Sequence, residues 1–348
     1  MTGTLLKQWQ TLPRSLQIIL GRSTLVIPQM FGVLLVTFFL IRLLPGDPAV
    51  LLLGNMQTPE AVEQLRERLG LNGTIWTQFL TYAQNVLQGD LGTSIFTSNP
   101  VVVDLMEKAP ATLELIFYAT ILTVALGLVL AIFSVVRPGG SVDVGSRIYG
   151  LAAGAIPDFW IALLLIYCFF TLLGWAAPPF GRIDALLTPP PAWTGFYTID
   201  TLIAGDFEAF RSAIGRLLLP VLTIAIVNAG GLMKMTQSIF DGVWRSDFVR
   251  HARACGLPES VIIRAALRNS LPPIITIVGF MIGYLLGAAV LVETIFSWNG
   301  LGQYAVQAVM NSDYPALQGF ILVAAAFILV VYLIVDILYE LADPRIRV

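Results

Sequence analysis

Residues 112–136 read TLELIFYATILTVALGLVLAIFSVV, a run of 25 residues in which Glu114 is the one charged residue. In an α-helix this run would extend about 37 Å, and the hydrocarbon core of a bilayer is about 30 Å thick. A helix that is apolar on all sides is buried in a protein core or in a membrane. The length and composition of the run therefore predict a helix that crosses a membrane.

Other parts of the chain repeat this pattern. Five further stretches are long and apolar enough to cross, and they lie near 25–44, 149–174, 216–236, 271–292 and 317–338. Hydrophobic residues make up 57% of the chain and charged residues only 12%, whereas a soluble domain carries about 25% charged residues. Alternating apolar runs of about ten residues, which are typical of membrane β-barrels, are absent. The sequence predicts an all-α polytopic membrane protein with six transmembrane helices.

The distribution of Lys and Arg predicts the orientation. If the N-terminus is cytoplasmic, 13 of the 20 Lys and Arg residues lie on the cytoplasmic side, which favours cytoplasmic positions for both termini. The predicted organisation is a cytoplasmic or interfacial segment 1–24 and a transmembrane domain 25–348. Within that domain, 45–110 and 175–215 are expected to be outer loops, and 237–270 a cytoplasmic loop. The first apolar stretch exceeds the 7–15 residues of a signal peptide, so it is expected to be retained.

The first predicted outer loop contains signals for two short helices. Thr58, Pro59 and Glu60 provide a cap, a proline at the first helical position and an acid in the first turn. A second helix is predicted from Trp76 to Leu87. The other outer loop, 175–215, is rich in proline and is expected to be irregular in part.

Several classes of function are disfavoured by what the sequence lacks. None of the three lysines follows a glycine, so the phosphate-binding loop of P-loop ATPases is missing. The single histidine, His251, excludes a multi-histidine metal site and a Ser-His-Asp triad. The formal net charge of −2 argues against nucleic-acid binding. We expect a non-catalytic chain without a cofactor or metal of its own.

The predicted cytoplasmic loop contains the stretch 247–258, DFVRHARACGLP. Small residues at Ala252 and Ala254, with Gly256 as the predicted helix stop, are typical of a short helix that enters a groove of a partner protein. Arg250 and Arg253 are three residues apart and share one helical face. The alternative interpretation is a basic helix that rests on anionic lipid beside the membrane.

This loop resembles the coupling loop of permease subunits of ATP-binding-cassette importers, in the branch that carries dipeptides, oligopeptides or nickel. The resemblance extends from about Leu25 to the end of the chain. Similar motifs occur in order at 42–48 (RLLPGDP), 89–94 (GDLGTS), 109–115 (APATLEL), 292–302 (VETIFSWNGLG), 313–319 (DYPALQG) and 342–345 (ADPR). Departures include Cys255, where Lys is common, Asn299, where Pro is common, and a longer 175–215 loop. The last departure leaves the receptor contact and the substrate open.

The resemblance implies a type I importer permease in the bacterial inner membrane, which forms half of a pathway for short peptides by alternating access. The implied partners are a second, homologous permease, two ATPases that bind ATP and Mg, and a periplasmic or lipid-anchored substrate-binding protein. The residues expected to dock on the ATPase are Asp247, Val249, Arg250, Ala252, Arg253, Ala254, Gly256 and Leu257. The residues expected to form an outer gate facing the receptor are Glu293, Phe296, Trp298, Gly300 and Gly302.

Alternative functions remain at this point. Nickel and oligosaccharides are other cargoes within the same architecture. An ion-coupled secondary transporter would need buried ionisable groups, for which Asp158 in the third stretch is the main candidate. We favour a role for Asp158 as a helix start at the membrane interface.

Overall fold

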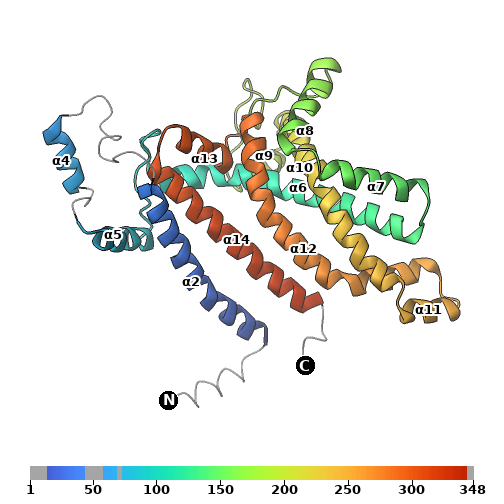
Figure 1. Ribbon diagram of the computed structural model, residues 1–348. Coiled ribbons are helices and arrows are strands. Elements are labelled where there is room, and N and C mark those ends of the chain that lie inside the picture. Colours follow the sequence, from blue (N-terminus) through green and yellow to red (C-terminus); the bar gives the residue numbers. More distant parts are fainter. Residues whose placement is uncertain (1–13, 44–57, 69–72, 343–348) are drawn as a thin grey trace, which may run out of the picture.

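The computed structural model describes residues 14–43, 58–68 and 73–342, and these parts are predominantly helical (Figure 1). The helices are α2 (Arg14–Leu43), α4 (Pro59–Arg68), α5 (Ile75–Leu87), α6 (Val101–Val136), α7 (Ser141–Ala153), α8 (Asp158–Leu165), the π-helix η1 (Ile166–Leu172), α9 (Tyr197–Ala204), α10 (Phe207–Trp244), α11 (Asp247–Ala254), α12 (Glu259–Ile295), α13 (Leu301–Met310) and α14 (Tyr314–Ala342). An all-helical fold is thereby confirmed over the described residues.

The described helices include four, α6, α10, α12 and α14, that are long and apolar enough to cross a membrane. The α7 and α8–η1 pair makes a fifth span if both parts are counted together. In α2, residues 24–39 form a shorter apolar segment. Six crossings therefore stay a prediction.

The predicted crossing near 149–174 is not one straight helix. The axes of α7 and of the helix from Asp158 to Leu172 differ by 109°. Pro157 lies at the break, where its ring disfavours helical geometry in the preceding residue and leaves no backbone N–H to donate. Asp158 is the first residue of α8, so the predicted helix start is confirmed.

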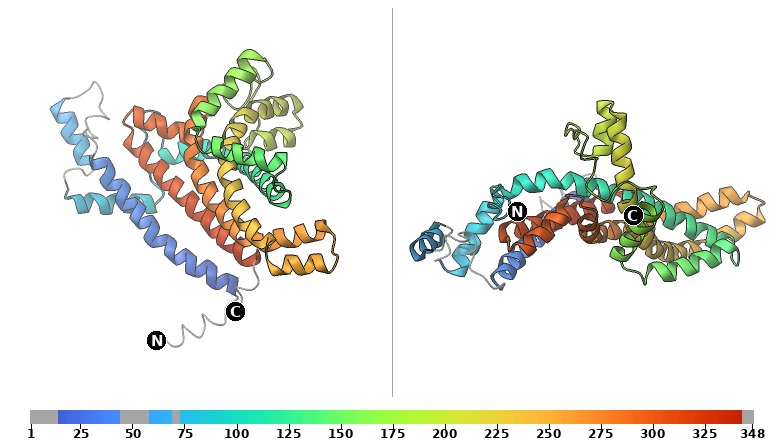
Figure 2. Two further views of the ribbon diagram at one scale, coloured as in Figure 1. Left: turned by 45° about the vertical axis from the view of Figure 1, so that its right-hand side comes forward. Right: turned by 90° about the horizontal axis from the view of Figure 1, so that it is seen from above.

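The long helices pack in the order α6, α10, α12, α14 and α2, with α10 in contact with both α6 and α12. Figures 1 and 2 show α2, α14, α12 and α10 side by side, with α6 crossing α10. Buried Leu115, Ile224 and Leu285 fill the main core between α6, α10 and α12. Where α7 crosses α10, a Cβ on Gly230 would lie 2.5 Å from the Cβ of Ala153, so this crossing requires glycine.

The bundle has two ends, which we name after the short helices they carry. The α13 end holds α13, the C-terminal end of α2 and the start of α14; the α11 end holds α11 and the start of α12 (Figure 1). Near the α13 end, α4 begins at Pro59 and α5 runs from Ile75 to Leu87 with Thr74 as its cap, which confirms both predicted short helices.

Segment 89–100 is fastened to the α13 end by buried carboxylates. Asp313 accepts hydrogen bonds from the Ser94 hydroxyl at 2.5 Å and from the backbone N–H of Phe96 at 3.0 Å. Asp104 accepts from the Thr97 hydroxyl at 2.5 Å and from the Asn99 side-chain amide at 3.0 Å, and also from the hydroxyl of Tyr304 at 3.3 Å. Burial, followed by the nearby carboxylates of Asp104 and Asp313, raises the pKa of Tyr304 above its ordinary value.

Candidate functional site

At the α11 end, the short helix α11 is fixed to the helices on either side of it. Val249 is fully buried and packs in one cluster with Trp244 of α10 and Ile262 of α12. The guanidinium of Arg253 lies 4.5 Å from the centre of the Trp244 ring, and its Nε donates to Glu259 at 3.1 Å. Helix α11 is therefore attached to the end of α10 and to the start of α12.

The stop after α11 depends on backbone conformation. Gly256 has a φ of +74°, in the left-handed region that side chains with a Cβ disfavour. A Cβ at this position would meet nothing within 4 Å, so space does not require the glycine. The predicted role of Gly256 as a helix stop is confirmed.

The opposite face of α11 is open to solvent. Among the predicted docking residues, Val249 is buried and Ala252 is half-buried, while the exposed ones are Asp247, Arg250, Arg253, Ala254, Gly256 and Leu257. Phe248 is also exposed, by 40%, and was not identified from the sequence. The sequence feature that could have identified Phe248 is its position next to another apolar residue, Val249. Neighbouring residues point to different sides of a helix, so only one of the two can be buried against the same partner. The exposed face thus combines apolar side chains with charged ones, two of which, Arg250 and Asp247, pair at 3.4 Å.

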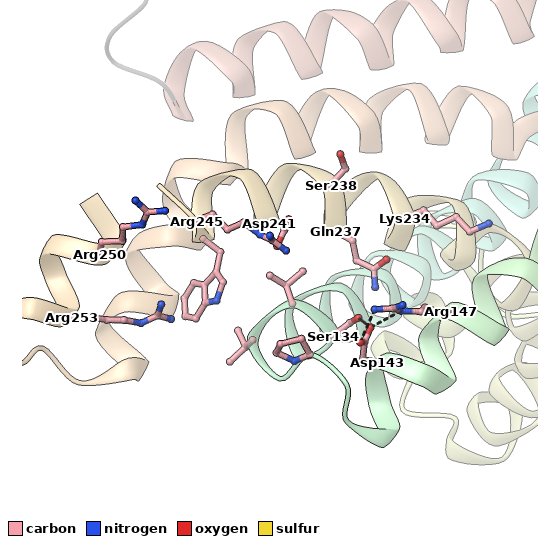
Figure 3. A pocket seen from close by; sticks show the side chains of 14 residues that line it. Ser134, Asp143, Arg147, Lys234, Gln237, Ser238, Asp241, Arg245, Arg250 and Arg253 are labelled. Atoms are coloured by element: carbon pink, nitrogen blue, oxygen red, sulfur yellow. Dashed lines mark hydrogen bonds and ion pairs between the residues drawn. The ribbon is translucent and has the colours of Figure 1, made fainter. Parts of the chain in front are cut away.

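Beside α11 lies an open cavity of about 950 Å³, bounded by α6, α7, α10 and α11 (Figure 3). Its charged lining consists of five cations and two carboxylates: Arg147, Lys234, Arg245, Arg250, Arg253, Asp143 and Asp241. The two carboxylates are paired within the cavity, Asp143 with Arg147 at 2.9 Å and Asp241 with Arg245 at 2.8 Å. Arg250 and Arg253 pair with carboxylates just beside the cavity, Asp247 at 3.4 Å and Glu259 at 3.1 Å, so the cavity presents charges of both signs.

At the α13 end, the carboxylate of Glu293 joins α12, α13 and α6. It is fully buried and accepts from the Thr112 hydroxyl at 2.6 Å. It also accepts from the backbone N–H groups of Gly302 at 2.8 Å and Gln303 at 3.1 Å, in the first turn of α13. This carboxylate therefore caps α13, because the first N–H groups of a helix have no partner within the helix.

The remaining predicted gate residues, Phe296, Trp298, Gly300 and Gly302, lie around Glu293, and we call this group the Glu293 node. Trp298 is 1% exposed and donates from Nε1 to the Ala111 carbonyl at 2.9 Å. Phe296 is buried in the main core. A Cβ on Gly300 would lie 2.5 Å from the Thr112 hydroxyl, and one on Gly302 would lie 2.5 Å from the Cα of Val290. The structure brings the five residues together and buries all of them; their part in a gate stays a prediction.

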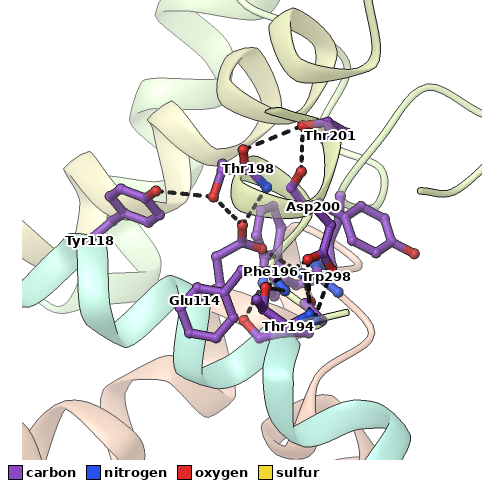
Figure 4. A network of polar contacts seen from close by, with 12 residues as sticks. Glu114, Tyr118, Thr194, Phe196, Thr198, Asp200, Thr201 and Trp298 are labelled. Atoms are coloured by element: carbon purple, nitrogen blue, oxygen red, sulfur yellow. Dashed lines mark hydrogen bonds and ion pairs between the residues drawn. The ribbon is translucent and has the colours of Figure 1, made fainter. Parts of the chain in front are cut away.

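A second buried network holds the predicted outer loop 175–215, and sequence reasoning missed it. Arg182 donates to Glu114 of α6 at 2.5 Å and to the Gly195 carbonyl at 2.7 Å, and its guanidinium stacks on Tyr197. The other oxygen of Glu114 accepts from the backbone and the hydroxyl of Thr198 at 2.9 and 2.7 Å (Figure 4). The sequence feature that could have indicated this network is Glu114, the one carboxylate in the apolar run 112–136.

The same loop is fastened to α10. Arg216 donates to the carbonyls of Pro178 and Phe180, and to the Asp184 carboxylate at 3.0 Å. The backbone N–H of Leu186, followed by the guanidinium of Arg216, lowers the pKa of Asp184. The irregular loop is thus anchored at both ends.

Comparison with known families decides the class of the chain. Residues 123–348 match the family of binding-protein-dependent transport system inner membrane components, and residues 15–116 match the N-terminal part of such membrane components. The chain belongs to this family. The predicted membership of the importer-permease family is confirmed, and with it a multi-pass position in the bacterial inner membrane.

Relatives of this permease cover almost its whole length. The dipeptide transport system permease protein of Alkalihalophilus pseudofirmus is 39% identical over 327 residues, 94% of this chain and 98% of the relative. The di/tripeptide transport system permease protein of Pseudomonas aeruginosa is 41% identical over 334 residues, 95% of this chain and 99% of the relative. The probable D,D-dipeptide transport system permease protein of Escherichia coli is 41% identical, covering 90% of this chain and 93% of the relative.

Proposed function

We propose that this permease forms one half of the translocation pathway of an ATP-driven importer of short peptides. The cargo rests on the relatives, whose names specify dipeptides, di/tripeptides or D,D-dipeptides. The proposed topology has six crossings, with α2 as the first and the bent α7 to η1 pair as the third. Both termini and α11 face the cytoplasm, which agrees with the excess of Lys and Arg there.

The observation that carries the mechanism is the attachment of α11. Its buried side, Val249, is joined to α10 and α12, whereas Phe248 and Leu257 are exposed by 40% and 47%. The exposed side, together with the charged cavity beside it, is the proposed docking surface for an ATPase subunit. Closure of the ATPases on ATP moves α11, and α10 and α12 carry this motion across the membrane. The path then opens outward, and hydrolysis resets it.

The proposed assembly contains a second, homologous permease, two ATPases and a substrate-binding protein outside the membrane. ATP and Mg bind to the ATPases, since this sequence lacks the phosphate-binding loop. The outer gate is proposed at the Glu293 node, whose buried residues would act as a rigid support rather than as a contact surface. Changes in the gate would then come from the whole node moving with α12.

The test uses the tagged permease in its native membrane. Purification in mild detergent followed by mass spectrometry should identify a second permease and P-loop ATPases. The Ala252→Glu variant places a charge in the half-buried side of α11, and it should lose the ATPases and dipeptide uptake while its amount in the membrane is unchanged. The control variant is Ala185→Glu, which introduces the same charge in the predicted outer loop 175–215 and should retain the ATPases.

Normal uptake by Ala252→Glu would overturn the role of α11. A homo-oligomer without ATPases, or uptake that follows a proton gradient, would overturn the proposed class and direct attention to Asp158.

A further inference from the structure

Helix α5 differs in composition from the helix that precedes it. Its sequence, IWTQFLTYAQNVL, contains no charged residue in 13 positions. In α4, PEAVEQLRER, five of the ten residues are charged. Helices on water-exposed surfaces ordinarily carry charged residues on their outer side. The composition of α5 therefore suits an environment other than bulk water.

The apolar residues of α5 form an arc of which only part is covered. Phe79 is 3% exposed and packs in one cluster with Leu34 and Phe38 of α2. Next to this covered part lies a stripe of three large apolar residues: Trp76, Leu80 and Leu87 are exposed by 63%, 63% and 87%. Their spacing of four and seven residues places them on one side of the helix. The adjoining side carries Thr77, Thr81 and Gln84.

The position of α5 along α2 sets its depth. The ring of Phe79 lies 5.8 Å from that of Phe31 and 5.3 Å from that of Phe38, and Trp76 lies 6.3 Å from Phe39. All three α2 partners belong to the apolar segment 24–39. Helix α5 is therefore seated alongside the part of α2 that is apolar enough to enter a membrane, and not beyond its end.

The exposed stripe continues an apolar surface of α2. On that helix Ile27 and Phe31 are four residues apart and so lie on one side, where they are exposed by 71% and 55%, as expected for residues in contact with lipid. Phe31 touches α5 directly, so the two exposed surfaces meet at this contact. A tryptophan beside leucines, next to a side of neutral polar residues, is typical of helices that lie at the boundary of a bilayer.

We propose that α5 lies in the bilayer as an interfacial helix, with Trp76, Leu80 and Leu87 in contact with phospholipid acyl chains. Thr77, Thr81 and Gln84 face the headgroups. The helix braces α2 on one flank while α14 packs on another. The leaflet is the outer one, and this part of the inference rests on the topology given under the proposed function.

The test compares two neighbouring positions in the intact transporter. Leu80→Cys and Thr81→Cys are introduced singly after replacement of Cys168 and Cys255 by Ser. Both positions are exposed in the structure, so an aqueous reagent would reach both of them in the absence of a membrane. In intact cells, a membrane-impermeant maleimide should label Leu80→Cys roughly tenfold more slowly, because its thiol lies about 5–10 Å below the headgroup boundary.

A second measurement identifies what covers the stripe. An environment-sensitive NBD fluorophore on Leu80→Cys or Leu87→Cys, in phosphatidylcholine nanodiscs, should be quenched by nitroxide-bearing lipid and resist aqueous iodide. The fluorophore on Thr81→Cys should be quenched by iodide. Equal labelling and equal iodide quenching at all positions would overturn the proposal.

Protection of Leu80→Cys that appears only with the second permease or the binding protein would also overturn it and assign the stripe to a protein partner. If Thr81→Cys is labelled only after permeabilisation, the proposed topology fails, whereas lipid quenching still decides whether α5 contacts acyl chains.

Discussion

Single residues at the α13 end are constrained by buried hydrogen bonds. The sequence before Glu293 gives no sign of polar partners for this carboxylate, because residues 284–292 are almost wholly apolar. It remains buried because the Thr112 hydroxyl and two backbone N–H groups of α13 satisfy its oxygens. A glycine at 300 allows Thr112 and Glu293 to approach this closely.

Gly300→Ala should therefore destabilise the permease. The added methyl group would meet Thr112 and Glu293 at about 2.5 Å, and such overpacking costs roughly 1–3 kcal/mol. Gly287→Ala in α12 is the matched control, since its Cβ would meet nothing within 4 Å. Thermal unfolding in detergent should show a lower midpoint for the first variant and an unchanged or higher midpoint for the second. Equal midpoints would contradict the packing of this node.

For single residues, the sequence identifies candidate functional positions, but it does not reveal their burial or their hydrogen-bond partners. The motif at 292–302 identified the five predicted gate residues, but their complete burial could not be read from it. Hydrogen bonds such as those of Glu114 with Arg182 and of Ser94 with Asp313 join positions far apart in the chain. No local pattern encodes such pairs, so they required the fold.

At the scale of the element, α11 has two sides with different tasks. Val249→Ala should loosen α11 and cost about 2 kcal/mol, because it leaves a cavity in the cluster with Trp244 and Ile262. Phe248→Ala, at an exposed position, should leave thermal stability unchanged and weaken ATPase binding. Thermal unfolding and co-purification of the ATPase measure the two effects separately. Identical behaviour of both variants would show that α11 does not have a separate attachment and docking side.

The loop anchored by Arg182 offers a test by double substitution. Glu114→Gln leaves the buried Arg182 without its carboxylate, and removal of one partner of a buried ion pair costs about 3–5 kcal/mol. Chymotrypsin should then cleave faster between 175 and 206, where aromatic residues are frequent. Glu114→Gln combined with Arg182→Met removes both charges and should recover part of the resistance. Cleavage at the parental rate in Glu114→Gln would show that the ion pair does not hold the loop.

Helices with clear start and stop residues could be predicted, and those without them could not. The sequence at 58–60 located the start of α4, and Gly256 located the end of α11. The long apolar stretches fixed the existence of α6, α10, α12 and α14, but the start of α6 lies at Val101, within the predicted loop 45–110. Uniform hydrophobicity hides the helical period, so neither boundaries nor packing partners can be read from it.

For the whole molecule, the native Cys255 reports both topology and assembly. It is exposed at the end of α11, so in a Cys168→Ser background an impermeant maleimide should label it only after cells are permeabilised. The presence of the ATPases should slow this labelling further. Leu186→Cys, at a position 95% exposed in the opposite loop, should label in intact cells when introduced into a cysteine-free background. Labelling of Cys255 from outside would reverse the proposed orientation.

The lengths of α10 and α12 have a mechanical consequence. With 38 and 37 residues, they are rods of about 55 Å, clamped together at one end by α11. Each rod contains proline: Pro220 in α10, and Pro272 with Pro273 in α12. Proline lacks the N–H of the helical ladder, so bending stiffness is lowest there. A displacement of α11 should therefore bend α10 and α12 mainly at these prolines. Because the prolines lie at different distances from α11, the far ends of the two helices should move by unequal amounts.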